Sequence, residues 1–351
     1  MALDDRIAKW TQWAIAQRWP GAHAGAIVAL RGDVSTRRFW RVALDGDDAA
    51  PRSAIVIDLG PEDLPLYARE LKLYPNRLPE PPWINLHRFL SILDVPIPAL
   101  FYWSSAERML LVEDVGSRSL FDAARAEPSK TADLCREAVR ELMRFHIDAS
   151  ARPARDCIAF QIAYDERLFR WELNRFIEFG LNSVSPGADP RAIESDLDRL
   201  AHALGELPRV FSHRDYHANN LFIQGTIAAP KIRIIDFQDA LMAPPAQDLA
   251  VLLTTRNTDD LISPAIEERL LDFYHAALIR RGIPTMGRND FATSYAQCVL
   301  QHALKCIGLF VRLEREGKHE YAAYTPHALA QARRMLARLP EFPHLAAALH
   351  P

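Results

Sequence analysis

The 351-residue sequence has few cysteines and no excess of positive charge. Its four cysteines form no C-x-x-C pair, so we interpret them as reduced and mostly buried. Lysine and arginine together number 42 against 45 for aspartate and glutamate, which gives a formal net charge of −3. This balance gives no reason to expect a nucleic-acid or anionic-membrane partner. A chain this long buries a sizeable core without disulfides, which excludes a small disulfide-rich scaffold.

Long apolar runs are also missing from the sequence. No segment approaches the ~20 apolar residues that a transmembrane helix requires. The first residues include Asp4 and Asp5 and lack the apolar core of a signal peptide. We therefore expect a cytoplasmic protein with no membrane partner.

The hydrophobic pattern changes part-way along the chain. An amphipathic helix near residues 7–17 and a short helix at 67–74 accompany strand-like segments at 26–30, 38–44, 53–59 and 109–112. Helical patterns then dominate at 131–145, 191–204 and 264–349, with two short strands at 221–223 and 231–235. Strands followed by helices indicate an α+β fold. We predict a mainly β lobe over residues 1–115, a mainly α lobe over 116–351, and a ligand cleft between them.

The most informative segment begins with His213-Arg214-Asp215. Asn220 follows five residues after this aspartate, and Asp236 follows another sixteen residues on. This order is the catalytic pattern of protein kinases. Phosphoryl transfer needs an oriented hydroxyl group, and Asp215 is suited to orient it and to accept its proton. The reaction also needs Mg²⁺ on the phosphates, for which Asn220 and Asp236 offer hard oxygen ligands.

The same segment allows a second interpretation. His213 and His217 have the i, i+4 spacing of a zinc-binding pair. No glutamate follows the first histidine, and the asparagine-rich loop is a poor helix. We therefore favour the kinase interpretation over a zinc site.

Several blocks of the sequence resemble the aminoglycoside phosphotransferase (choline kinase-like) family of small-molecule kinases. The blocks are similar to the family's phosphate loop and second strand, third strand, hinge, metal-binding segment and a late helix, at residues 30–42, 55–58, 111–116, 236–250 and 304–313. Within the family, the sequence looks most like the bacterial cell-wall amino-sugar kinases. Those enzymes phosphorylate the anomeric hydroxyl of N-acetylmuramate and N-acetylglucosamine during recycling of the cell wall.

The resemblance implies a bilobal protein-kinase-like fold that uses ATP and Mg²⁺. It implies that Asp215 is the catalytic base, that Asn220 and Asp236 are magnesium ligands, and that Asp248 braces the catalytic loop. His217 could donate a hydrogen bond to the transferring phosphoryl group or simply pack the loop. The residues implied to bind the nucleotide are Gly32, Ser35 and Thr36 in the phosphate loop, Arg41 on the second strand, and Glu113 and Val115 at the hinge.

Two features depart from the kinase pattern. The third strand has no lysine, and Asp58 stands near its place. Arg41, Lys72 or the backbone N–H groups of residues 33–36 could neutralise the phosphates instead, although Arg41 could equally be a solvated strand charge. The phosphate loop contains Gly32 as its only glycine, so we expect the Ser35 and Thr36 hydroxyls and the backbone to hold the nucleotide.

We expect a phosphotransferase that acts on a small hydroxyl acceptor, best matched by the anomeric hydroxyl of an amino sugar. An aminoglycoside, choline or another small alcohol is the alternative acceptor, and a non-catalytic kinase-like binding module is the alternative class. A pocket that collects Asp239 and other carboxylates would favour a cationic acceptor. A basic pocket would favour the lactyl carboxylate of muramic acid. The sequence does not define the oligomeric state.

Overall fold

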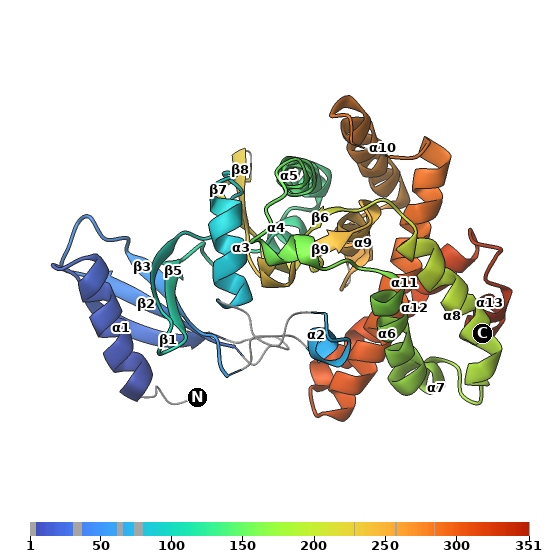
Figure 1. The fold of residues 1–351 in the computed structure, drawn as a ribbon, viewed down its shortest axis with the longest axis horizontal. Coiled ribbons are helices and arrows are strands. Elements are labelled where there is room, and N and C mark those ends of the chain that lie inside the picture. The colour runs from blue at the N-terminus through green and yellow to red at the C-terminus, as the bar shows by residue number, and fades with distance from the viewer. Residues whose placement is uncertain are drawn as a thin grey trace.

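The N-terminal part of the chain forms an antiparallel sheet with one helix on its outer face. The computed structural model describes residues 5–30, 37–61, 66–73, 80–227, 229–256, 258–283 and 285–350. The strands are β1 (His23–Leu30), β2 (Arg38–Asp45), β3 (Ser53–Asp58), β4 (Leu100–Ser104) and β5 (Met109–Glu113), in the order β1-β2-β3-β5-β4. Helix α1 (Asp5–Arg18) lies against this sheet at one end of the molecule (Figure 1).

The sheet buries both of its faces, each against a different core. Because side chains alternate along a strand, Trp40 and Val56 lie on the face that packs against Ile7 and Trp10 of α1. Ile57, with its neighbours Leu110 and Val112, lies on the opposite face and joins the large core of the C-terminal part. The second face therefore looks toward the rest of the molecule.

Two helices from the N-terminal part pack against the C-terminal part. Helix α2 (Leu66–Glu70) is held by Trp171, whose Nε1 donates to Glu70 at 2.7 Å. Helix α3 (Pro82–Ser91) places the Trp83 ring 5.2 Å from the ring of Phe237, centroid to centroid. The lobe boundary after residue 115 stays a prediction, and these contacts cross it.

The C-terminal part is mainly helical (Figure 1). Its α-helices are α4 (Leu120–Ala126), α5 (Thr131–Met143), α6 (Glu166–Arg175), α7 (Leu181–Val184), α8 (Pro190–Gly205), α9 (Ala246–Thr254), α10 (Pro264–Arg280), α11 (Arg288–Arg315), α12 (Thr325–Leu336) and α13 (Pro343–Leu349). Helix α11 has 28 residues and packs against α6, α9 and α12. A Cβ atom on Gly308 would lie 2.6 Å from the carbonyl oxygen of Arg175, so glycine is needed where α11 meets the end of α6.

Two small antiparallel ladders carry the segment that resembles a kinase catalytic loop. One pairs β6 (Val210–Ser212) with β9 (Leu241–Ala243), and the other pairs β7 (Leu221–Thr226) with β8 (Ala229–Ile234). The second confirms the strands expected at 221–223 and 231–235. The α+β fold and the free, buried state of the four cysteines are confirmed as well. No helix in the described part of the chain is both long and apolar enough to span a membrane.

Candidate active site

The loop between β6 and β7 is fixed through its backbone. The buried carboxylate of Asp248 accepts hydrogen bonds from the backbone N–H groups of His213 at 2.6 Å and Arg214 at 2.7 Å. It also accepts a hydrogen bond from His146 Nε2 at 2.9 Å. Arg214 has a left-handed backbone with φ of 76°, so the chain turns sharply just before Asp215. Asp248 therefore braces the loop that carries Asp215, as expected.

Further hydrogen bonds tie this loop to the β7–β8 hairpin. The His213 imidazole donates to the carbonyl oxygen of Ile235 at 2.9 Å, and the Ile235 N–H donates to the carbonyl oxygen of Asn220 at 3.0 Å. The buried hydroxyl of Tyr216 donates to the Ala138 carbonyl at 2.9 Å. These hydrogen bonds fix the loop that carries Asp215 relative to the hairpin that precedes Asp236.

Asp215, Asn220 and Asp236 are brought together. Asn220 Nδ2 donates to the Asp215 carbonyl oxygen at 3.0 Å and lies 3.5 Å from Asp236 Oδ2. The amide oxygen of Asn220 has no hydrogen-bond partner among the described residues. Asp236 has a left-handed backbone with φ of 66°, a conformation that aspartate tolerates better than most residues and that is frequent at functional sites.

These oxygens fit a hard divalent cation. Asn220 and Asp236 together offer an unpartnered amide oxygen and a carboxylate, which are ligand types that Mg²⁺ accepts. The described residues contain no cluster of three or more His, Cys, Asp or Glu side chains arranged to hold a metal. A cation here would therefore take most of its ligands from phosphate and water, as magnesium commonly does.

Positive charge surrounds the Asp215 carboxylate. Its burial favours the neutral acid, but nearby Lys305 and Arg214 outweigh this effect and lower the pKa of Asp215 below its usual value. Both cations also contact the buried Glu172: Lys305 Nζ lies 3.2 Å and Arg214 Nη2 2.7 Å from its Oε1. Burial again opposes ionisation, yet Lys305 and Arg214 lower the pKa of Glu172 to about 2. This ionised Glu172 holds both cations beside Asp215.

His217 is a neutral imidazole in this site. Burial, reinforced by the positive charge of Arg256, lowers the pKa of His217 to about 3. Its Nε2 lies 3.3 Å from Asn220 Nδ2, and this donor assigns the imidazole proton to Nδ1. The Nδ1 atom is buried and has no hydrogen-bond partner in the described part of the chain. His217 therefore has an unused donor within the site.

Known proteins with similar sequences identify the class of this molecule. Residues 27–286 match the phosphotransferase enzyme family, which covers more than half of the chain. The chain belongs to that family. It is 27% identical over 342 residues to an N-acetylmuramate/N-acetylglucosamine kinase of Pseudomonas aeruginosa, covering 94% of this chain and 90% of the relative. A kinase of the same name from Caulobacter vibrioides is 39% identical over 120 residues, covering 33% of this chain and 31% of the relative.

Solved structures of the same fold belong to small-molecule kinases. A choline kinase from Streptococcus pneumoniae superposes with a TM-score of 0.56 at 14% identity, covering 98% of this chain and 100% of that one. A microcompartment-associated aminopropanol kinase gives a TM-score of 0.58 at 16% identity, covering 89% and 93%. An ADP-bound aminoglycoside phosphotransferase gives 0.56 at 13%, covering 95% and 99%. The kinase-like fold is confirmed, and the phosphotransferase is an enzyme of the kinase class.

At the hinge of the phosphotransferase, Arg41 is bound by an acidic side chain. Its Nε and Nη2 donate to the two carboxylate oxygens of Asp114 at 2.7 and 2.9 Å, and Nη2 also donates to the Gly116 carbonyl at 2.9 Å. Burial raises the pKa of Asp114, but Arg41 and Ser53 outweigh it, so the net shift is downward. Arg41 is thus held at the hinge, and among the described residues it forms no hydrogen bond or ion pair with Asp215, Asn220 or Asp236.

Of the other residues expected to contact the nucleotide, some lie among the described residues and some do not. The Glu113 carboxylate is bound by Arg233 and accepts from the Ala99 N–H at 3.0 Å, while Val115 is buried beside it. Gly32, Ser35 and Thr36 lie outside the described residues. Lys72 follows α2 in an exposed turn. The nucleotide roles of these residues stay predictions.

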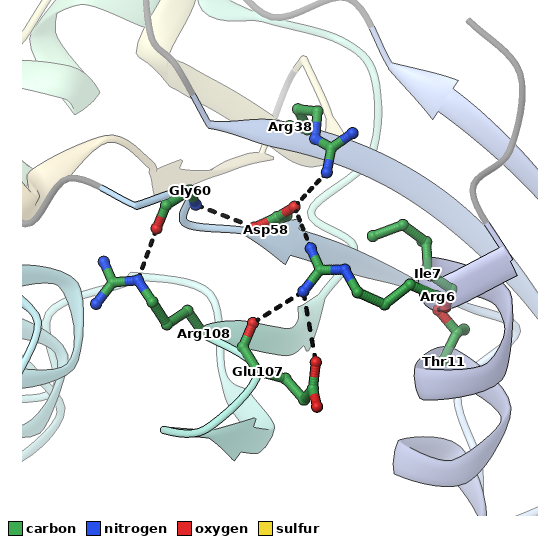
Figure 2. A network of polar contacts seen from close by, with 8 residues as sticks. All are labelled: Arg6, Ile7, Thr11, Arg38, Asp58, Gly60, Glu107 and Arg108. Carbon is green, nitrogen blue, oxygen red and sulfur yellow. Dashed lines mark hydrogen bonds and ion pairs between the residues drawn. The ribbon is translucent and has the colours of Figure 1, made fainter.

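Asp58 stands near the place of the absent lysine, and its side chain points to the outer face of the sheet, on which α1 packs (Figure 2). Its Oδ2 accepts from Arg6 of α1 at 2.8 Å and from Arg38 of β2 at 2.6 Å, and its Oδ1 accepts from the Gly60 N–H at 3.0 Å. The side chain lies on the same side of β3 as Val56, which packs against α1. Asp58 therefore anchors the helix rather than facing the lobe junction.

Four important residues around this site carry no local sequence signal. Lys305 and Glu172 come from α11 and α6, Arg37 precedes β2, and Arg256 follows α9. None belongs to the loop that resembles a kinase motif. The blocks at residues 30–42 and 304–313, which resemble the family, contain Arg37 and Lys305 but gave neither a role, and Glu172 and Arg256 lie outside every such block.

The pKa values in the site predict a flat pH profile. The pKa of Asp215 lies below its usual value, and the pKa of His217 is lowered to about 3. Asp215 would lose its negative charge, and His217 gain a positive one, only as the pH falls well below the usual histidine range near 6.5. The kcat measured at saturating substrates should therefore change less than ~2-fold between about pH 6 and pH 8. An inflection near pH 6.5 that disappears in His217→Asn would contradict this assignment.

Proposed function

We propose that this enzyme transfers the γ-phosphate of ATP, with Mg²⁺, to the anomeric hydroxyl of N-acetylmuramate and N-acetylglucosamine. Relatives named N-acetylmuramate/N-acetylglucosamine kinase align over nearly the whole of both chains. The observation that carries the proposal is the set of Asp215, Asn220 and Asp236 on one rigid loop and hairpin. A cytoplasmic role in recycling cell-wall sugars stays a prediction.

Each residue in this set has a defined chemical role in the proposal. Asp215 would orient the acceptor hydroxyl and take its proton, and its low pKa keeps it ionised and ready to do so. Asn220 and Asp236 would hold Mg²⁺, which supplies charge neutralisation at the phosphates. The neutral His217 would donate its Nδ1 proton to the transferring group. The adenine would lie against the backbone of residues 113–115.

The charges near Asp215 favour an anionic acceptor. Lys305 lowers the pKa of Asp215, and Arg256 lowers that of His217, so both cations act on the catalytic loop. Asp239 is the acid on which a cationic acceptor would depend, but burial raises its pKa and so disfavours its charged form. By the criterion of a basic pocket, this balance supports an acceptor that carries a carboxylate, such as the lactyl group of muramic acid.

An acceptor panel tests the proposal. The protein would be incubated with ATP and Mg²⁺ and with N-acetylglucosamine, N-acetylmuramate, the 1-deoxy analogue, choline or an aminoglycoside, and the position of the phosphate read by NMR. We expect sugar 1-phosphates from the two amino sugars and no product from the 1-deoxy analogue. Phosphate at C6, or reaction with the cationic acceptors alone, would overturn the anomeric assignment and leave a kinase of another alcohol.

Substitution of Lys305 should change the preference of the enzyme between N-acetylmuramate and N-acetylglucosamine. Lys305→Met removes the charge and keeps the length, and a lost charge-assisted hydrogen bond typically costs about 1.5–3 kcal/mol. The kcat/KM for N-acetylmuramate should therefore fall ~10-fold or more relative to that for N-acetylglucosamine, which lacks the carboxylate. Steady-state kinetics with both sugars measures this ratio.

The control for this variant is Lys231→Met, on the exposed side of β8. It removes the same charge from the surface and should leave the ratio unchanged. An equal loss for both sugars in Lys305→Met would mean that Lys305 acts through Asp215 and Glu172 and does not recognise the acceptor.

A further inference from the structure

The side of β3 that faces the rest of the molecule carries no positive charge. Ile55 and Ile57 point to that side, and Asp58 points to the other. Of the candidate replacements for the absent lysine, Arg41 is bound at the hinge by Asp114, and Lys72 lies in an exposed turn after α2. The third candidate, the backbone N–H groups of residues 33–36, lies outside the described residues. A charged side chain for the phosphates of a bound nucleotide must therefore come from elsewhere.

Arg37 reaches the candidate metal site from the N-terminal sheet. Its Nη2 lies 2.9 Å from Oδ1 of Asp236, and only 17% of its side chain is exposed. It stands one residue before β2 and shares the side of Phe39, which packs on the large core. Its neighbour Arg38 points the other way, to Asp58 and to the Trp40 ring at 5.4 Å. Adjacent arginines thus serve opposite faces of the sheet.

We propose that Arg37 is the nucleotide-phosphate ligand that replaces the strand lysine, and that it neutralises Asp236 when no nucleotide is bound. The inference rests on the proposed use of ATP. A guanidinium group remains charged at all physiological pH values and offers several N–H donors in one plane, which suits phosphate oxygens. A metal ion on Asp236 would take over the neutralisation of that carboxylate. The guanidinium could then turn its donors to the phosphates.

In this role Arg37 neutralises Asp236 in the empty site and binds the phosphates when a nucleotide is present. Burial and the negative charge of nearby Asp215 oppose ionisation of the Asp236 carboxylate, but Arg37 outweighs both, so the pKa of Asp236 lies below its usual value. An ion pair with Arg37 offsets that repulsion in the empty site. The ion pair between Arg37 and Asp236 also joins the start of β2 to the segment after β8. The Arg37 guanidinium therefore already lies where the proposal places the phosphates.

Binding measurements separate this role from a structural one. Dissociation constants for ATP, ADP and adenosine would be measured by calorimetry, in the presence of Mg²⁺, for the wild type, Arg37→Ala and Arg38→Ala. Arg37→Ala should weaken the binding of ATP and of ADP about 10- to 100-fold, the range for a lost charge-assisted hydrogen bond, and leave adenosine within ~2-fold. Arg38→Ala, on the outer face, should change none of the three by more than ~3-fold.

The outcomes that overturn the inference are distinct. Unchanged ATP and ADP affinity in Arg37→Ala would refute it, and so would an equal loss for adenosine, which would indicate a purely structural role. Should Arg37→Ala fail to fold, Arg37→Gln removes the charge with less change in shape and is expected to give the same pattern. A wild type that binds adenosine and ATP equally weakly would overturn the proposed function as well.

Discussion

Asp215→Asn should bind ATP and amino sugar like the wild type but transfer phosphate at least ~100-fold more slowly, the low end of general-base effects. The amide keeps a hydrogen-bonding group next to the acceptor and loses the ability to take its proton. The effect stays moderate because phosphoryl transfer is largely dissociative and an anomeric hydroxyl is more acidic than an ordinary alcohol. Single-turnover kinetics with pre-bound sugar would measure the step directly.

The matched control for this variant is Asp198→Asn on α8. Asp198 is largely exposed and pairs with Arg170, so the same chemical change there should leave turnover intact. Ionised Glu172 still holds Arg214 and Lys305 in Asp215→Asn, and we expect the fold to persist. Wild-type turnover in Asp215→Asn would eliminate Asp215 as the catalytic base.

Asp236→Ala should abolish phosphoryl transfer and remove the Mg²⁺-dependent part of nucleotide binding. The carboxylate is the one anionic ligand that we propose for the metal among the described residues, and Asn220 alone offers a single neutral oxygen. Binding of ATP without Mg²⁺ should persist, because Arg37 loses its ion pair with Asp236 and keeps its charge for the phosphates. Calorimetric titration of ATP with and without Mg²⁺ would show both effects.

A second variant separates backbone effects from metal binding. Alanine tolerates the left-handed backbone at residue 236 less well than aspartate, at a cost of about 1–2 kcal/mol of stability. Asp236→Asn tolerates the same backbone and also lacks the negative charge, so it should lose activity without that cost. Asp260→Ala, at an exposed position, serves as the control. Near-normal turnover in both variants of Asp236 would exclude it as a metal ligand.

The part of the site that could be predicted from sequence is the part built from neighbouring residues. Asp215, Asn220 and Asp236 lie on one loop and the hairpin that follows it, so their spacing in sequence largely determines their spacing in space. Glu172 and Lys305 meet Asp215 only because α6 and α11 pack closely, which depends on contacts distant in the sequence. No local sequence pattern predicts such a long-range contact.

The fold was predictable to a similar degree. Long periodic helices and the apolar strands near residues 38–44 and 53–59 have strong local patterns, and they match α5, α8, β2 and β3. The short strands β4, β6 and β9 have only three to five residues and depend on their partners for stability, so no pattern revealed them. Arg41 illustrates the same limit, because its partner Asp114 stands 73 residues away.

The anchoring of Asp58 to α1 changes how the N-terminal sheet can evolve. In protein kinases a strand lysine links the sheet to both the nucleotide and a neighbouring helix, so one residue serves folding and ligand capture together. Here the acid on β3 binds Arg6 and Arg38 on the far face of the sheet. Substitutions that tune phosphate affinity can therefore accumulate outside the strand without disturbing the charges that hold this lobe together. Stability and ligand affinity become separately adjustable traits.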